Sequence, residues 1–220
     1  MARKNWIILA VAAVLAAAGG GAWYLSHAGD DIVAPAAAAT KAGAAVTAHD
    51  MTLGNPKAKV VMIEYAAPIC PHCAHFNATV IPLLKQNYIN TGKMLYVFRV
   101  FPLHPADGVA EKLARCMGRD KYFPFMDQLF ANQKDWDPEY GVQDIRGAML
   151  AQAARQGMSE AQFTACINDS KPDAAINKVA QEAVDRYHLD HTPTVILNGA
   201  VQKDATWEAL KPAIDKALAN

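Results

Sequence analysis

Two cysteines with two residues between them follow a short apolar run, and this arrangement restricts the fold more than any other feature of the sequence. Residues 60–65, VVMIEY, are rich in β-branched and aromatic side chains and predict a buried strand. Pro71 favours the first turn of a helix, which is predicted to run to about residue 90 with a kink near Pro82. Residues 94–100 predict a second strand, so the order strand, helix, strand predicts a right-handed parallel crossover.

The rest of the chain predicts a block of helices, then a hairpin and a closing helix. Apolar residues at helical spacing predict helices over residues 109–117, 122–132, 138–156, 159–167 and about 172–187. Residues 194–197 predict a strand, which Asn198 and Gly199 turn back onto residues 200–202. An amphipathic helix is predicted over residues 207–218.

The order of these elements, βαβ, helices and then ββα, predicts an α/β, thioredoxin-like fold with a helical insertion. The domain is expected over residues 50–220, with the insertion at about residues 106–170. A domain of this length can bury a sizeable core. The 21 basic and 21 acidic side chains leave a formal net charge of 0, so no basic surface is expected to bind nucleic acid.

The N-terminal segment has the composition of a membrane-directed sequence. No charged residue occurs from Trp6 to Leu25, and a helix of this length spans roughly 30 Å, the hydrocarbon thickness of a bilayer. Arg3 and Lys4 precede the stretch, and Asp30 and Asp31 follow it. The positive charge on the first side predicts that the rest of the chain is exported.

Two interpretations of this segment stay open. Glycines at 19–21 interrupt the apolar run, and the small residues at 16–18 and at 26–28 resemble cleavage sites. We therefore expect residues 1–28 to be a signal peptide or an N-terminal membrane anchor, followed by an alanine-rich linker over residues 29–49. Both interpretations place the domain outside the cytoplasm, where disulfides are permitted.

The Cys70-Pro71-His72-Cys73 motif fits a redox pair better than its alternatives. A zinc site needs four ligands, usually from two close pairs, and the other two cysteines of the chain stand singly. Covalent haem needs a histidine directly after the second cysteine, where this chain has Ala74. A purely structural disulfide is seldom found at the first turn of a helix after a buried strand. No metal and no cofactor are therefore expected.

The predicted position of the motif gives its two cysteines different chemistry. Cys70 lies just before the helix, where unpaired N–H groups and the helix dipole stabilise a thiolate. A protonated His72 adds a nearby positive charge, so both effects are expected to lower the Cys70 pKa. Cys73, one turn into the helix, is expected to be more buried and to resolve mixed disulfides. The predicted catalytic residues are Cys70, Pro71, His72 and Cys73.

A family resemblance follows from the motif and from two flanking features, Glu64-Tyr65 before it and Thr192-Pro193 before the later strand. With these features the chain resembles the DsbA-like family, bacterial periplasmic proteins that introduce disulfides. The resemblance extends over roughly residues 53–218. It implies a thioredoxin fold with a helical insertion, an oxidising role towards exported proteins with free cysteines, and reoxidation by a quinone-linked membrane oxidoreductase.

The same resemblance implies roles for three further residues. It implies a cis peptide bond before Pro193, with the backbone at Thr192 and Pro193 binding the substrate main chain. It also implies that Glu64 is a buried carboxylate of raised pKa that exchanges protons with Cys73 through water; the alternative is a Glu64 that only ends its strand. Thr192 before the proline is also usual in disulfide isomerases and reductases, which leaves the direction of electron flow open.

The two remaining cysteines, Cys116 and Cys166, fall on apolar faces of predicted helices. Of the three ways to pair four cysteines, joining these two leaves Cys70 and Cys73 free to react. We predict a structural disulfide between them, and two separate buried thiols are the alternative.

These features together predict a dithiol oxidase that forms disulfides in exported proteins. A disulfide isomerase or reductase on the same fold is the first alternative. The second is a periplasmic binding or chaperone-like module in which the cysteines take no part in turnover.

Overall fold

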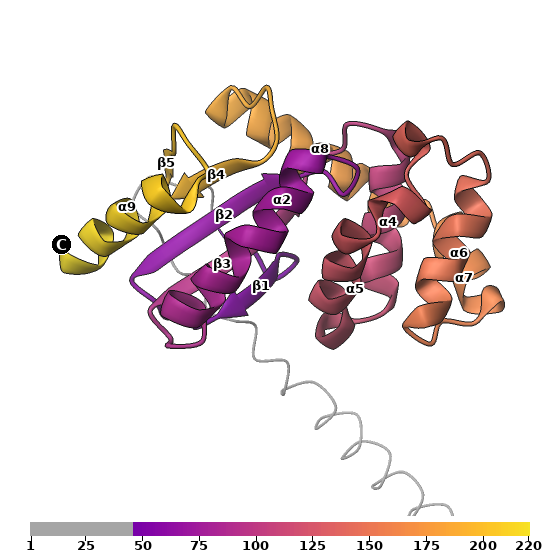
Figure 1. Cartoon of the computed structure of the whole chain (residues 1–220), viewed down its shortest axis with the longest axis horizontal. Coiled ribbons are helices and arrows are strands. Elements are labelled where there is room, and N and C mark those ends of the chain that lie inside the picture. The colour runs from indigo at the N-terminus through magenta and orange to yellow at the C-terminus, as the bar shows by residue number, and fades with distance from the viewer. Residues whose placement is uncertain (1–45) are drawn as a thin grey trace, which may run out of the picture. The chain divides into compact units, whose positions relative to one another are not determined.

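A computed structural model describes residues 46–220; the predicted signal peptide or anchor, and most of the predicted linker, lie outside these residues. A five-stranded sheet with the strand order β1-β3-β2-β4-β5 organises this part of the chain (Figure 1). The strands are β1 (Met51–Gly54), β2 (Val60–Ala66), β3 (Met94–Val100), β4 (Thr194–Leu197) and β5 (Ala200–Val201). No helix in the described part of the chain is both long and apolar enough to cross a membrane.

The central strands β2 and β3 are parallel, as the predicted crossover requires, with Val60 opposite Met94. Strand β4 runs antiparallel to β2, and β5 runs antiparallel to β4. Asn198 and Gly199 connect β4 to β5 with φ angles of 46° and 86°. Positive φ at both positions is the requirement of a type I′ turn, so the predicted hairpin is confirmed.

Helices cover both faces of the sheet. On one face Ala183 packs with Val61, and on the other Phe76 and Leu210 pack with Met62. These side chains come from the helices α8 (Lys171–Tyr187), α2 (Pro71–Thr79) and α9 (Trp207–Ala219). Every residue of β2 and β3 is buried, because a central strand between two helical layers has no solvent face.

The predicted long helix after the cysteine motif is interrupted. Helix α2 ends at Thr79, a short helix α3 covers Ile81–Leu84, and a π-helical turn η1 covers Lys85–Ile89. The interruption falls beside Pro82, whose ring would clash with the preceding helical turn and which has no N–H to donate. A kink was expected at this proline, and the structure shows a break.

The helical insertion lies at one side of the sheet (Figure 1). Its elements are α4 (Pro105–Cys116), α5 (Arg119–Ala131), the short turns η2 (Gln133–Asp135) and η3 (Pro138–Tyr140), α6 (Ile145–Arg155) and α7 (Glu160–Asn168). The predicted single helix over residues 138–156 is wrong in its first half. Gly141 ends η3 at a φ of 87°, and Asp144 then caps α6 by accepting the N–H of Gly147 at 2.8 Å.

Candidate active site

The cysteine motif lies at the start of α2, directly after the central strand β2. A tight turn closes when the N–H of Cys70 donates to the carbonyl of Ala67 at 2.9 Å. Cys70 is the last extended residue, with φ −71° and ψ 122°, and Pro71 occupies the first helical position. Cys73 is completely buried, whereas His72 is exposed. Both cysteines are free thiols in the structure.

Their environment lowers the pKa of Cys70 and raises that of Cys73. The pKa of Cys70 falls from 9.0 to about 5, chiefly because the Cys73 thiol donates a hydrogen bond to it. The side chain of Thr192 also lowers this pKa, and so do the backbone N–H groups of Cys73 and His72, whereas burial of the thiol opposes these effects. Burial is the main reason that the pKa of Cys73 is raised, and the charge of Glu64 acts in the same direction.

One expected cause of the low Cys70 pKa is not supported. A positive charge on the His72 imidazole was expected to stabilise the thiolate, but that imidazole is exposed and is not one of the main contributors to the low pKa. His72 contributes through its backbone N–H instead, which is a consequence of the helix start.

Thr192 and Pro193 face the cysteine motif from the segment before β4. The peptide bond between them is cis. Antiparallel pairing of β4 with β2 sets Thr194 opposite Tyr65, which brings the preceding residues to the end of β2 where α2 begins. The carbonyl oxygen of Thr192 lies 3.5 Å from the sulfur of Cys70, and Thr192 is itself buried.

Glu64 is buried within β2, with 1% of its surface exposed. Burial raises its pKa to about 8, despite a hydrogen bond donated by the hydroxyl of Tyr96. The negative charges of Asp127 on α5 and of Cys70 raise this pKa further. Tyr96 was not predicted as a partner of Glu64, because this contact depends on the register between β2 and β3.

A cleft of about 470 Å³ lies beside the motif, between α2 and the loop that leads into α9. Its walls include His72, Phe76, Pro193 and Trp207. The proline before β4 therefore lines the same cleft as the first turn of α2. Among residues 46–220 no group of three or more histidine, cysteine or acidic side chains is arranged to hold a metal ion.

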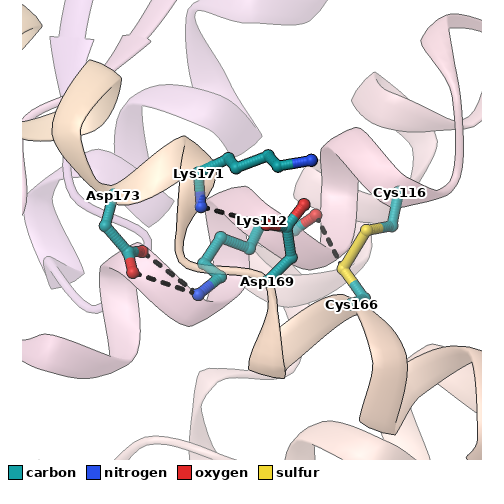
Figure 2. The surroundings of a disulfide bond; sticks show 6 residues. All are labelled: Lys112, Cys116, Cys166, Asp169, Lys171 and Asp173. Carbon is teal, nitrogen blue, oxygen red and sulfur yellow. Dashed lines mark hydrogen bonds and ion pairs between the residues drawn. A yellow bond between two sulfur atoms is a disulfide. The ribbon is translucent and has the colours of Figure 1, made fainter.

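Cys116 and Cys166 form a disulfide far from the motif in the chain, with 6.2 Å between their Cα atoms. It joins the end of α4 to α7, as Figure 2 shows. The carbonyl oxygen of Lys112 lies 3.2 Å from the Cys166 sulfur. The ammonium group of Lys112 pairs with Asp173 of α8 at 3.1 Å, so α4, α7 and α8 are tied together at this point (Figure 2).

Comparison with known proteins gives the same classification as the geometry. The family model described as thioredoxin matches residues 46–216. A Rickettsia conorii protein named as a protein-disulfide oxidoreductase is 31% identical over 185 residues, covering 84% of this chain. That match covers 66% of the Rickettsia protein, just under two thirds of its length. Disulfide bond formation protein D of Bacillus subtilis is 22% identical over 181 residues, covering 76% of each chain.

Among solved structures, Wolbachia pipientis alpha-DsbA1 superimposes with a TM-score of 0.71 and 31% sequence identity. The superposition covers 78% of this chain and 92% of that one. The fold and the paired thiols at the start of α2 define a thioredoxin-fold protein with a dithiol site. Within that class, the chain belongs to the DsbA-like family.

Proposed function

We propose that the protein is a thiol:disulfide oxidoreductase that oxidises cysteine pairs in exported proteins through a Cys70–Cys73 disulfide. One observation supports this most strongly: the site lowers the pKa of Cys70 to about 5 while it raises that of Cys73. Interactions that favour the Cys70 thiolate favour the reduced form of the pair, which makes the disulfide a strong oxidant. The names of the Rickettsia and Bacillus relatives agree with this chemistry.

The proposed reaction has two exchange steps. A substrate thiolate attacks the sulfur of Cys70 in the disulfide, the Cys70–Cys73 bond breaks, and Cys73 leaves with the electron pair. The second substrate thiolate then attacks the substrate sulfur of this mixed disulfide, and Cys70 leaves as a thiolate. The substrate loses two electrons and gains a disulfide, and the protein gains two electrons and becomes a dithiol. The low pKa of Cys70 makes it the better leaving group in the second step.

Glu64 is the proposed proton donor in the first step. Cys73 is completely buried, and a thiolate formed there must be neutralised because its solvation is poor. With its pKa raised to about 8, Glu64 is mostly protonated at neutral pH and can supply that proton. Tyr96 holds the carboxyl group through its hydroxyl hydrogen bond.

The cleft beside the motif is the proposed substrate site. It joins exposed His72 on α2 to Pro193, so a substrate strand lying along Thr192 and Pro193 has its cysteine next to Cys70. Backbone recognition suits a protein that acts on many substrates, because main-chain groups carry no sequence information. The Cys116–Cys166 disulfide takes no part in turnover in this proposal and stabilises the insertion.

Export to the periplasm or cell envelope belongs to the same proposal, because the pair must be reoxidised where disulfides are stable. A quinone-linked membrane oxidoreductase is the proposed partner for that step. A reporter enzyme that works only outside the cytoplasm, fused after Asn220, is expected to be active. Activity of a cytoplasm-dependent reporter at this position would contradict the proposed location.

The function is tested with a reduced, unfolded protein that contains two cysteines. Oxidised protein is expected to form the client disulfide with loss of one Cys70–Cys73 disulfide per client disulfide, and a Cys70→Ser variant is expected to be inactive. Equal, stoichiometric binding of the client by the wild type and by the Cys70→Ser variant, without oxidation, would favour a binding or chaperone-like module instead.

A further inference from the structure

The short segment between β2 and α2, residues 67–70, is held by side chains of the helical insertion. Gln133, in the turn η2, donates from its amide nitrogen to the carbonyl oxygens of Pro68 and Cys70 at 2.8 and 3.0 Å. Asp107, in the first turn of α4, accepts the backbone N–H of Ile69 at 2.8 Å. The backbones of Pro68, Ile69 and Cys70 are therefore all hydrogen-bonded to the insertion.

Both of these side chains are buried, with 6% of Gln133 and 0% of Asp107 exposed. The second carboxylate oxygen of Asp107 accepts the N–H groups of Leu103 and His104, each at 2.9 Å. Asp107 thus joins the start of α4 to the segment before α2. In a buried site the loss of any of these hydrogen bonds costs free energy, because the released backbone group has no water molecule to bond with instead.

The bonds act on the part of the backbone that sets the environment of Cys70. The low pKa of Cys70 depends partly on the N–H groups of His72 and Cys73, which lie near its sulfur because Cys70 occupies the N-cap position of α2. The Cys70 carbonyl already accepts the N–H of Ala74 at 3.0 Å, and Gln133 is its second donor. Without Gln133, the Pro68 carbonyl would have to rotate towards water, and the start of α2 would move with it.

We propose that Gln133 and Asp107 are positioning residues for Cys70, through which the helical insertion fixes the conformation of the nucleophile. The inference rests on the proposed role of Cys70 as the attacking cysteine. Neither side chain touches a reacting atom in this account. Their effect is to keep residues 67–70 in the one conformation that places the Cys70 sulfur over the first turn of α2.

The experiment compares two near-isosteric variants, Gln133→Met and Gln133→Glu, with a matched control. Methionine keeps the length of the side chain but has no N–H group, and glutamate keeps its shape but directs oxygens at the two carbonyls. Gln152→Met is the control. Gln152 is also a buried glutamine of the insertion, with 1% exposed, and it accepts from Gln128 at 2.8 Å. It makes no hydrogen bond with residues 67–70, so its variant reports the effect of weakening the insertion alone.

Two measurements are made on each protein: the pH titration of the thiolate ultraviolet absorbance in the reduced form, and the rate at which reduced glutathione opens the oxidised form. Gln133→Met should raise the titration midpoint of Cys70 by about 0.5 to 1 pH unit, and Gln133→Glu by at least as much. Both variants should also change the glutathione rate. Gln152→Met should leave the midpoint at the wild-type value even where it lowers the melting temperature.

Midpoints equal to the wild-type value in both Gln133 variants would overturn the inference, and so would an equal shift in Gln152→Met. A wild-type protein whose thiolate titrates only near the ordinary cysteine range would overturn the proposed function itself. The wild-type titration therefore separates failure of the proposed function from failure of the positioning role.

Discussion

Changing the pH should change the stability of the reduced protein relative to the oxidised protein, because only the reduced form carries a Cys70 thiolate. The pKa of this thiol is lowered from 9.0 to about 5 in the folded protein. A group with a depressed folded pKa stabilises the folded state fully above its unfolded pKa, and this stabilisation is lost as the pH falls through the folded value. Each pKa unit corresponds to about 1.4 kcal/mol. The unfolding free energy of the reduced form, relative to that of the oxidised form, should therefore increase by about 2 kcal/mol between pH 5 and pH 7.

Denaturant unfolding of both forms at several pH values between 5 and 8, with Cys116–Cys166 kept intact, measures this difference. The disulfide between Cys70 and Cys73 closes a very short loop, and its chain-entropy contribution does not depend on pH. Glu64 is present in both forms, and the charge of the thiolate raises its pKa, so the slope of the difference reports the Cys70 thiolate together with its coupling to Glu64. The Cys70→Ser variant cannot form the disulfide, and its unfolding free energy, compared with that of the oxidised protein, should show no such slope. A difference that stays constant between pH 5 and pH 7 in the wild type would refute the reasoning.

Four further predictions concern the separate roles of the cysteines and of the buried acid. Cys73→Ser should accumulate mixed disulfides with client proteins, detected on non-reducing gels, and Cys70→Ser should not; trapping on Cys73 would reverse the assignment. Mild reduction should expose Cys70 and Cys73 to alkylation before the other pair, as judged by mass spectrometry. Simultaneous labelling of all four cysteines in that experiment would contradict a structural role for Cys116 and Cys166. Replacing these two cysteines by alanine should lower the unfolding free energy by about 4 kcal/mol, because their disulfide joins residues that are 50 positions apart in the chain. The pKa of Glu64 is raised from 4.5 to about 8, so the stability linked to its proton is complete below the unfolded value and is lost as the pH rises through 8. The unfolding free energy of the Glu64→Gln variant should therefore exceed that of the wild type by up to about 3 kcal/mol at pH 7 and by almost nothing at pH 4. A difference that does not change with pH would contradict the raised pKa.

The elements around the motif could be predicted because their signals are local. The apolar run of β2 and the proline at the first position of α2 mark a strand end and a helix start within a few residues. Strand β1 was missed because it is an edge strand of four residues, of which only Met51 is buried. The over-long helix predicted over residues 138–156 shows the opposite problem, since apolar spacing continued across the break that Gly141 and Asp144 make.

From spacing alone the candidate site was predictable only as far as its residues lie in one motif, and Glu64, Thr192 and Pro193 were assigned through the family resemblance. Cys70 and Cys73 are assigned by spacing alone, because their chemistry follows from the helix start. The partners of the motif come from distant parts of the chain. Tyr96 reaches Glu64 through the pairing of β3 with β2, and Gln133 reaches Pro68 across 65 positions. Neither contact has a sequence signature, because the first depends on the register between two strands and the second on how the insertion packs against the start of α2.

The reduction potential of the Cys70–Cys73 couple, measured by equilibration with glutathione, tests the central claim most directly. Thiolate stabilisation at Cys70 makes the disulfide oxidising, so we predict a potential well above that of thioredoxin, towards about −120 mV. A disulfide reductase would have a potential near about −270 mV. A value at that reducing end would contradict the proposal that this protein introduces disulfides into exported proteins.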